Sequence, residues 1–155
     1  MRNSIATLIA TWFGCGFSPQ APGTVGSAAA VLIAIGLNGW LHWPPWWFAV
    51  LAVALTAPGI WSADIVAKRL GKVDPGLVVV DEVVGEWLTI AGATTLNWRS
   101  WLLAFALFRV LDIWKPAPVR QLERLHGGTG IVADDFMAGI YGAIAIFIAG
   151  RLHFY

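Results

Sequence analysis

The sequence predicts an all-α integral membrane bundle with about five apolar spans and a short N-terminal interfacial helix. Its composition points to this class: 58% of the 155 residues are hydrophobic, only 12% are charged, and the mean hydropathy is +0.71. Soluble domains carry about 25% charged residues. We expect a single domain over residues 1–155. Composition also argues against nucleic-acid binding, because the chain has no basic stripe.

The expected elements follow from the apolar runs and their interruptions. Residues 5–13 form an apolar run broken by polar residues, without a clear cleavage site, which favours a short interfacial helix over a signal peptide. The predicted spans are residues 24–41, 45–67, 78–96, 98–114 and 136–152. Several are near the lower limit of the roughly 17–25 residues needed to cross a bilayer. Pro58 predicts a kink in the second span.

The distribution of lysine and arginine predicts the orientation of the spans. Basic residues concentrate in the second-to-third and fourth-to-fifth loops, which are therefore expected to face the cytoplasm. Tryptophans gather on the opposite side, as an aromatic belt would. The basic loop residues are Lys68, Arg69, Lys72, Lys115, Arg120 and Arg124. The belt residues are Trp40, Trp43, Trp46, Trp47, Trp98 and Trp101.

Six of the nine carboxylates lie beside or inside these spans, and the predicted orientation of the spans places them near one membrane face. They are Asp81, Glu82, Glu86, Asp112, Asp134 and Asp135. An ionisable group inside an apolar span costs roughly 2.5–3.5 kcal/mol. Several such groups at one depth favour a shared cation, and dense carboxylate oxygens suit Mg²⁺ rather than zinc. The alternative for any single acid is that it caps a helix N-terminus.

Two further motifs have the chemistry of a phosphate site. The glycine- and proline-rich residues 14–27 precede a helix, where free amides bind phosphate, and Ser18, Thr24 and Ser27 add hydroxyl groups. An ordinary capped turn is the alternative. In the motif FRVLDIWKPAP, Arg109 and Lys115 are candidates for substrate contact. The more distal basic residues of that loop are explained by the orientation rule or by contact with anionic lipid.

Taken together, these motifs resemble the phosphatidylglycerophosphatase A family of bacterial inner-membrane lipid phosphatases. The resemblance covers residues 13–27, 67–75, 78–87, 108–124 and 126–141 in order. It implies Mg²⁺-dependent hydrolysis of the terminal phosphate of phosphatidylglycerophosphate, giving phosphatidylglycerol and phosphate. It also implies a multi-pass protein of the bacterial inner membrane with its active site facing the cytoplasm, in contact with membrane lipid.

The resemblance also assigns residues to roles. The implied catalytic residues are Asp81, Asp134, Asp135, Arg109 and Lys115. The implied metal ligands are Asp81, Glu82, Asp112, Asp134 and Asp135, and the implied phosphate-binding residues are Ser18, Thr24, Ser27, Arg109 and Lys115. The resemblance is weaker at Glu86 and Asp64, so it assigns no role to them. His126 is a minor candidate for a proton donor. The nucleophile stays open between a water activated by the cation and an aspartate.

Three other functions compete with this interpretation. An ion- or proton-coupled transporter also uses intramembrane acids, but would spread them across the membrane depth. A CDP-alcohol phosphotransferase uses aspartates and Mg²⁺, but its signature of aspartates at fixed spacing is absent from the sequence. A non-catalytic lipid-binding relative would share the fold, and only an assay separates it from an enzyme.

Overall fold

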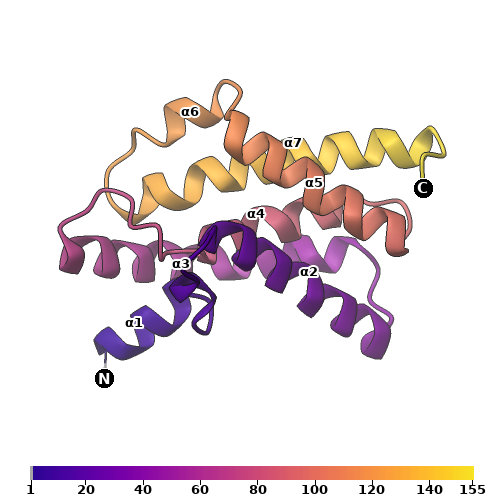
Figure 1. Ribbon diagram of the computed structural model, residues 1–155. Helices are drawn as coiled ribbons and strands as arrows, with labels where there is room; N and C mark the ends of the chain where they lie inside the picture. Colours follow the sequence, from indigo (N-terminus) through magenta and orange to yellow (C-terminus); the bar gives the residue numbers. More distant parts are fainter. Residues whose placement is uncertain (1) are drawn as a thin grey trace.

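The computed structural model describes residues 2–155, and every regular element in that range is helical (Figure 1). The elements in chain order are α1 (Arg2–Ala10), η1 (Cys15–Phe17), α2 (Pro22–Leu41), α3 (Trp46–Leu70), α4 (Val80–Ala91), α5 (Trp98–Trp114), α6 (Val119–Leu122) and α7 (Gly128–Arg151). The predicted all-α class is therefore confirmed. α3 remains one helix through Pro58.

Three helices are long and apolar enough to cross a membrane, namely α2, α3 and α7. α5, with 17 residues, is at the lower limit of spanning length. α4 has only 12 residues and is about 18 Å long, well short of a bilayer core of about 30 Å. The predicted third span is thus too long. Gly92 ends α4, and Asn97 starts α5 with a capping box to Ser100.

The start of α7 also differs from the prediction. The sequence predicts a last span over residues 136–152, with Asp134 and Asp135 at its opening. The helix instead begins at Gly128, eight residues earlier. A Cβ at Gly128 would collide with the backbone of Ile60 in α3, so tight packing between the two helices overrides the low helix propensity of glycine. Asp134 and Asp135 therefore lie in the second turn of α7 and do not open it.

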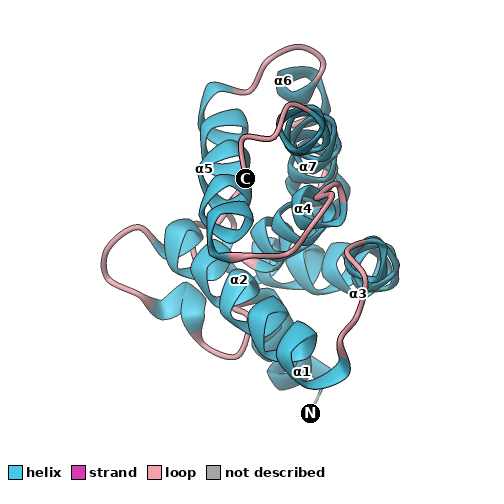
Figure 2. Cartoon of the chain, turned by 90° about the vertical axis from the view of Figure 1, so that its right-hand side faces the viewer, coloured by secondary structure: helices cyan, strands magenta, loops and turns pink. Residues whose placement is uncertain are grey.

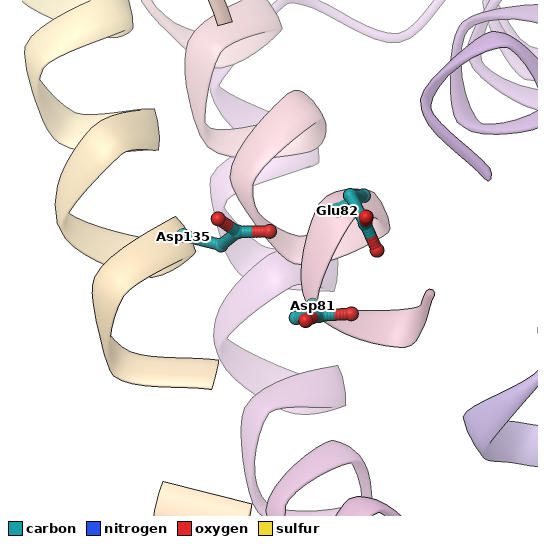
Figure 3. Close-up of side chains that lie close together, drawn as sticks. All are labelled: Asp81, Glu82 and Asp135. Atoms are coloured by element: carbon teal, nitrogen blue, oxygen red, sulfur yellow. The ribbon is translucent and has the colours of Figure 1, made fainter. Parts of the chain in front are cut away.

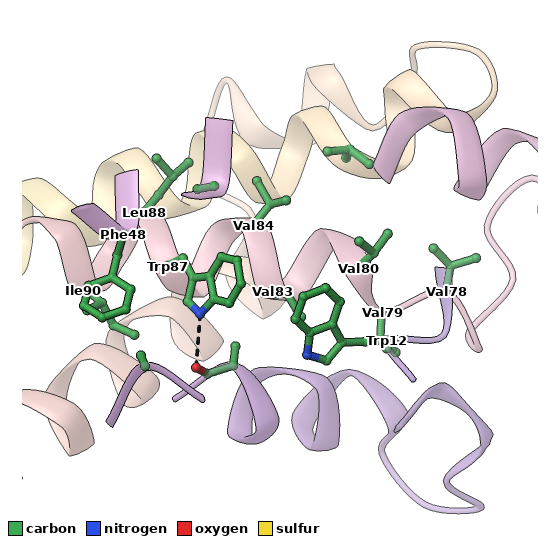
Figure 4. Close-up of a cluster of buried hydrophobic side chains, with 14 of the residues drawn as sticks. Trp12, Phe48, Val78, Val79, Val80, Val83, Val84, Trp87, Leu88 and Ile90 are labelled. Atoms are coloured by element: carbon green, nitrogen blue, oxygen red, sulfur yellow. Dashed lines mark hydrogen bonds between the residues drawn. The ribbon is translucent and has the colours of Figure 1, made fainter. Parts of the chain in front are cut away.

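α4 is the buried centre of the bundle. It packs against α7, α3, α2 and α5, and these surround it in both views (Figures 1 and 2). Its valine, leucine and isoleucine side chains fill the core shown in Figure 4. The indole N–H of Trp87 donates a hydrogen bond of 3.1 Å to the Ala30 carbonyl and ties α4 to α2. The acids in the first turn of α4 are thereby held in the interior.

Two glycines allow α4 and α7 to approach closely. A Cβ at Gly139 of α7 would lie 2.5 Å from the carbonyl oxygen of Gly85. A Cβ at Gly85 would lie 2.7 Å from the carbonyl oxygen of Asp135. Small residues that let helix backbones meet are typical of membrane helix pairs. Since each glycine follows an aspartate by four residues, the same contact brings Asp81 and Asp135 together.

The polar motifs of the chain meet at one end of the bundle. The first turns of α2 and α4, the C-terminus of α5, and the early part of α7 all contribute to one pocket there. Tryptophans occupy the opposite helix ends, where Trp46 and Trp47 stack at 4.8 Å and Trp98 is exposed. Most of the carboxylates and most of the tryptophans therefore lie at opposite ends of the bundle, although exposed Trp114 ends α5 on the pocket side.

The α4–α7 contact predicts that Gly139→Ala destabilises the protein. The added methyl group meets backbone rather than a mobile side chain, so we expect a loss of about 1–3 kcal/mol. Thermal unfolding in detergent measures the change. Gly36→Ala is the matched control, because nothing in residues 2–155 lies within 4 Å of its Cβ and alanine favours a helix. Equal melting temperatures for the two variants would contradict the close contact.

Candidate active site

A polar pocket of about 290 Å³ opens at the charged end of the bundle. Four helices and the loop before α4 line it, so residues far apart in the sequence meet there. Its polar and glycine lining comprises Gly23, Thr24, Asp74, Gly76, Asp81, Glu82, Arg109, Asp112, Lys115, Asp134 and Asp135. All of the predicted metal ligands and both predicted basic residues are in this set, which makes the pocket the candidate active site.

Three carboxylates form the centre of the pocket. Oxygen atoms of Asp81, Glu82 and Asp135 all lie within 4.8 Å of one another (Figure 3). Asp81 and Glu82 come from the first turn of α4, and Asp135 points toward them from α7. In residues 2–155, Asp81 Oδ1 and Glu82 Oε2 are buried without a hydrogen-bond partner. Unpartnered hard oxygens that repel one another fit a divalent cation such as Mg²⁺.

Arg109 reaches the same centre from α5. Its Nη1 atom lies 2.7 Å from Asp112 Oδ2 and 4.0 Å from Glu82 Oε1. The N–H groups of Arg109 do not point at Asp112 well enough for this short contact to be a hydrogen bond. Within the described chain, Nε and Nη1 of Arg109 therefore have no hydrogen-bond partner. Asp112 also adjoins Asp135. Arg109 thus retains free donors that face an acidic pocket, as a phosphate-binding arginine requires.

Lys115 is positioned by two acids at the end of α5. Its Nζ atom lies 2.7 Å from Asp134 Oδ2 and 3.1 Å from Glu123 Oε1. Burial lowers the pKa of Lys115, but the hydrogen bonds and charges of Asp134 and Glu123 outweigh it, and the pKa is raised overall. Lys115 therefore stays cationic. Asp134 Oδ1 also accepts from the Asp135 amide at 3.0 Å, so Asp134 already has partners on both oxygens.

Only one of the three predicted hydroxyl residues lines the pocket. Thr24 does so beside Gly23, in the first turn of α2, where amides lack intrahelical partners. The Ser18 hydroxyl donates to the Gln20 carbonyl at 2.9 Å, and the Ser27 hydroxyl donates to the Gly23 carbonyl at 3.1 Å. Neither serine is among the pocket residues. A Cβ at Gly23 would meet the Glu82 carboxylate, so glycine is needed for this close approach.

Sequence reasoning missed Asp74, which lies in the loop before α4 and lines the pocket. Desolvation raises the pKa of its carboxyl; the Lys115 charge opposes this, and the Glu123 and Asp112 charges add to it. Two sequence signals were its place in a short polar loop before Pro75 and its position within the stretch 67–75 that the family resemblance covers. With Asp74 included, six carboxylates face two cationic side chains in this pocket.

The remaining candidates lie outside the pocket. Asp64 forms an ion pair of 2.6 Å with Lys68 on α3. His126 is exposed and lines a different surface hollow beside Asp64. Glu86 is fully buried on α4, and neither of its oxygens has a hydrogen-bond partner in the part of the chain described. The pocket thus brings together the acids and bases of three motifs and leaves these three residues apart.

The fold and the pocket define a small helical membrane protein with a site suited to a metal ion and a phosphate group. The family model described as Phosphatidylglycerophosphatase A matches residues 8–150. The chain therefore belongs to the phosphatidylglycerophosphatase A family and is a phosphatase. No solved structure matches the chain.

Three curated relatives are similar over most of their length. A Bacteroides thetaiotaomicron protein provisionally named phosphatidylinositol-3-phosphatase is 43% identical, covering 94% of this chain and 93% of its own. The Escherichia coli phosphatidylglycerophosphatase A is 38% identical, and the match covers 93% of this chain and 83% of the relative. The Haemophilus influenzae phosphatidylglycerophosphatase A is 37% identical, and the match covers 90% of this chain and 85% of the relative.

The carboxylate centre predicts opposite effects of two neighbouring substitutions in metal-free protein. Asp135→Asn relieves repulsion with Asp81 and Glu82, so we expect the melting temperature in chelator at pH 8 to rise by about 2–6 °C. Asp134→Asn weakens the partner of half-buried Lys115, so we expect a fall of similar size. Scanning calorimetry in detergent measures both. Two shifts of the same sign would contradict the proposed difference between these aspartates.

Proposed function

We propose that the chain hydrolyses the terminal phosphate of phosphatidylglycerophosphate in an Mg²⁺-dependent reaction, giving phosphatidylglycerol and phosphate. The family and the names of two relatives support this substrate. The observation that carries the proposal is the charge of the pocket, where carboxylates outnumber cationic side chains six to two. A phosphate monoester carries a charge of about −1.5 to −2 and would be repelled unless cations compensated the acids.

Asp81, Glu82 and Asp135 are the residues that would hold Mg²⁺. They offer carboxylate oxygens from two helices, and Asp81 and Glu82 each carry one buried oxygen that lacks a hydrogen-bond partner among the residues described. When bound, Mg²⁺ would neutralise charge and polarise a phosphoryl oxygen. Asp112 and Asp134 lie next to this centre but are engaged by Arg109 and Lys115. We therefore assign them to positioning those cations, with metal ligation as their second role.

The basic side chains and the α2 N-terminus would bind the transferring phosphoryl group. Arg109 presents unpaired N–H donors, and Lys115 is held at a fixed place by Asp134 and Glu123. The Gly23 and Thr24 amides add neutral donors at the positive end of a helix dipole. Such preorganised donors stabilise the charge on the equatorial oxygens, which is the main demand of phosphoryl transfer.

The pocket volume limits what enters the site. A volume of about 290 Å³ corresponds to about ten water molecules at roughly 30 Å³ each. This space accommodates a phosphate and part of a glycerol headgroup, and its charged lining disfavours acyl chains. The substrate would therefore present only its headgroup to the acids and keep its chains in the surrounding lipid.

The same arrangement supports a site at the cytoplasmic face of a bacterial inner membrane. The basic residues Lys68, Arg69, Lys72, Arg120 and Arg124 lie in or beside the loops at the pocket end, and such loops face the cytoplasm under the positive-inside rule. The acids collect at this one end, which disfavours a transporter that needs acids throughout the membrane depth.

Phosphatidylinositol 3-phosphate is the second candidate substrate. The relative with the highest identity among the three is provisionally named for that activity. Both lipids present a phosphate monoester beyond a phosphodiester, so the charged groups of the pocket suit either. The two headgroups differ in the bulk of the inositol ring, and the family and the names of two relatives favour the smaller glycerol headgroup.

Phosphate release in detergent tests the proposed reaction. We expect the purified protein to release phosphate from phosphatidylglycerophosphate with Mg²⁺, to lose activity in chelator, and to act at least about tenfold less efficiently on phosphatidylinositol 3-phosphate. Asp81→Asn should lower kcat by about 10²-fold or more, because it removes a cation ligand. The control Asp64→Asn should retain full activity, since Asp64 pairs with Lys68 away from the pocket. Full activity in chelator would contradict the metal dependence.

Accessibility labelling tests the orientation. In a Cys15→Ser background, cysteines at Trp43 and Trp98 should react with an impermeant reagent added to intact cells. Cysteines at Lys72 and Arg120 should react only after the membrane is opened, because they are predicted to be cytoplasmic. The reverse pattern would place the pocket on the outer face and would exclude the proposed location.

A further inference from the structure

An apolar groove of about 690 Å³ lies between α2 and α5 and has no assigned role. Its lining consists of Ala28, Val31, Leu32, Ile35, Trp98, Trp101, Leu102 and Phe105. Leu32 and Leu102 are each more than 60% exposed in the isolated protein. A groove of this kind is filled by whatever apolar group lies beside it, so the neighbouring features of the structure decide its occupant.

The groove begins one helical turn from the active-site pocket on the same two helices. On α2, the face runs from Thr24 in the pocket through Ala28 and Leu32 to Ile35, in helical steps of three or four residues. On α5, the matching face runs backward from Arg109 in the pocket through Phe105 and Leu102 to Trp98. α2 and α5 run in opposite directions along the chain (Figure 1), so the two faces extend from the pocket side by side.

The length of this path matches one leaflet of a bilayer. From Thr24 to Ile35 the helix rises by about 17 Å at roughly 1.5 Å per residue. Half of a hydrocarbon core of about 30 Å is about 15 Å. A lipid whose headgroup entered the pocket would therefore find a groove along its acyl chain for the whole depth of its own leaflet.

We propose that this α2–α5 groove binds one acyl chain of the lipid substrate while the pocket binds its phosphate. The proposal rests on the proposed function, because it takes the substrate to be a phospholipid with a terminal phosphate. The groove holds the chain by shape and van der Waals contact, since lipid tails are as apolar as the groove itself. It thereby orients the headgroup toward Arg109 and the carboxylates and sets a preference for long-chain over short-chain substrates.

A second apolar groove on the protein serves as a control for the α2–α5 groove. It has a volume of about 530 Å³ and lies between α3, α4 and α7, with Trp46, Gly92 and Ile144 among its lining residues. Its lining includes the first residue of α3 and the end of α4, at the end of the bundle away from the acids, and it does not follow the α2 and α5 faces that lead to the pocket. A chain in that groove would not be connected to a headgroup in the active site.

Filling each groove with an indole ring tests the proposal. Ala28→Trp and Leu32→Trp fill the α2–α5 groove, and the matched control Ile144→Trp fills the other. With dipalmitoyl phosphatidylglycerophosphate as the substrate, we expect the first two variants to lower kcat/KM by about tenfold or more and the control to leave it unchanged. With the dibutyryl form, whose chains end before the groove, all three should match the wild type.

The other outcomes overturn the proposal. Equal losses on both substrates would mean that the groove residues only pack the helices, and unchanged activity on dipalmitoyl substrate would mean that no chain lies there. If the wild type hydrolyses neither substrate, the proposed function fails instead. A phosphatidylglycerophosphate analogue with a diazirine at the end of one acyl chain then tests the groove by itself. It should label residues 28–35 and 98–105 in the wild type, much less in Leu32→Trp, and uniform labelling of all lipid-facing helices would refute the groove.

Discussion

The close contact between α4 and α7 is the constraint on which the site depends. Gly85 and Gly139 let the two backbones meet, and Asp81 and Asp135 precede them by one helical turn. Bulkier residues at either glycine would separate the helices and with them the carboxylates. α4 is also too short to cross a membrane and is buried on nearly every side. Its first turn is therefore held inside the protein by packing, independently of any interaction that its acids make.

The electrostatics of the pocket follow from this placement. Packing forces acids from α4 and α7 toward one point, where Asp81, Glu82 and Asp135 repel one another. The nearby cations only partly compensate, because Arg109 is shared between Asp112 and Glu82 and Lys115 between Asp134 and Glu123. Under the proposed function, a divalent cation with a phosphate ligand would relieve this repulsion. Stability and the proposed function would therefore oppose each other at these residues.

Much of this architecture could be predicted from the sequence, and the failures have physical reasons. Helical spacing and the expected path of the apolar spans through the membrane predicted that Asp81, Asp112 and Asp135 lie at the same membrane depth. In the structure, these three residues line one pocket. The lengths of α4 and α7 were predicted wrongly because close packing at glycines decides them, and packing partners cannot be read from one sequence. Asp74 was missed because a loop aspartate has no periodic signal. Ser27 was placed in the pocket because a helix start does not reveal which hydroxyl groups turn back onto the backbone.

We infer that carboxylates from α4 and α7 share one divalent cation. Anomalous diffraction from crystals grown with Mn²⁺ in place of Mg²⁺ tests it most directly, because the signal locates the ion without assumptions about activity. We expect a peak in contact with oxygens of Asp81, Glu82 and Asp135, with Arg109 and Lys115 beside it. A fully occupied peak elsewhere in the protein, or α4 and α7 carboxylates too far apart to share an ion, would contradict it.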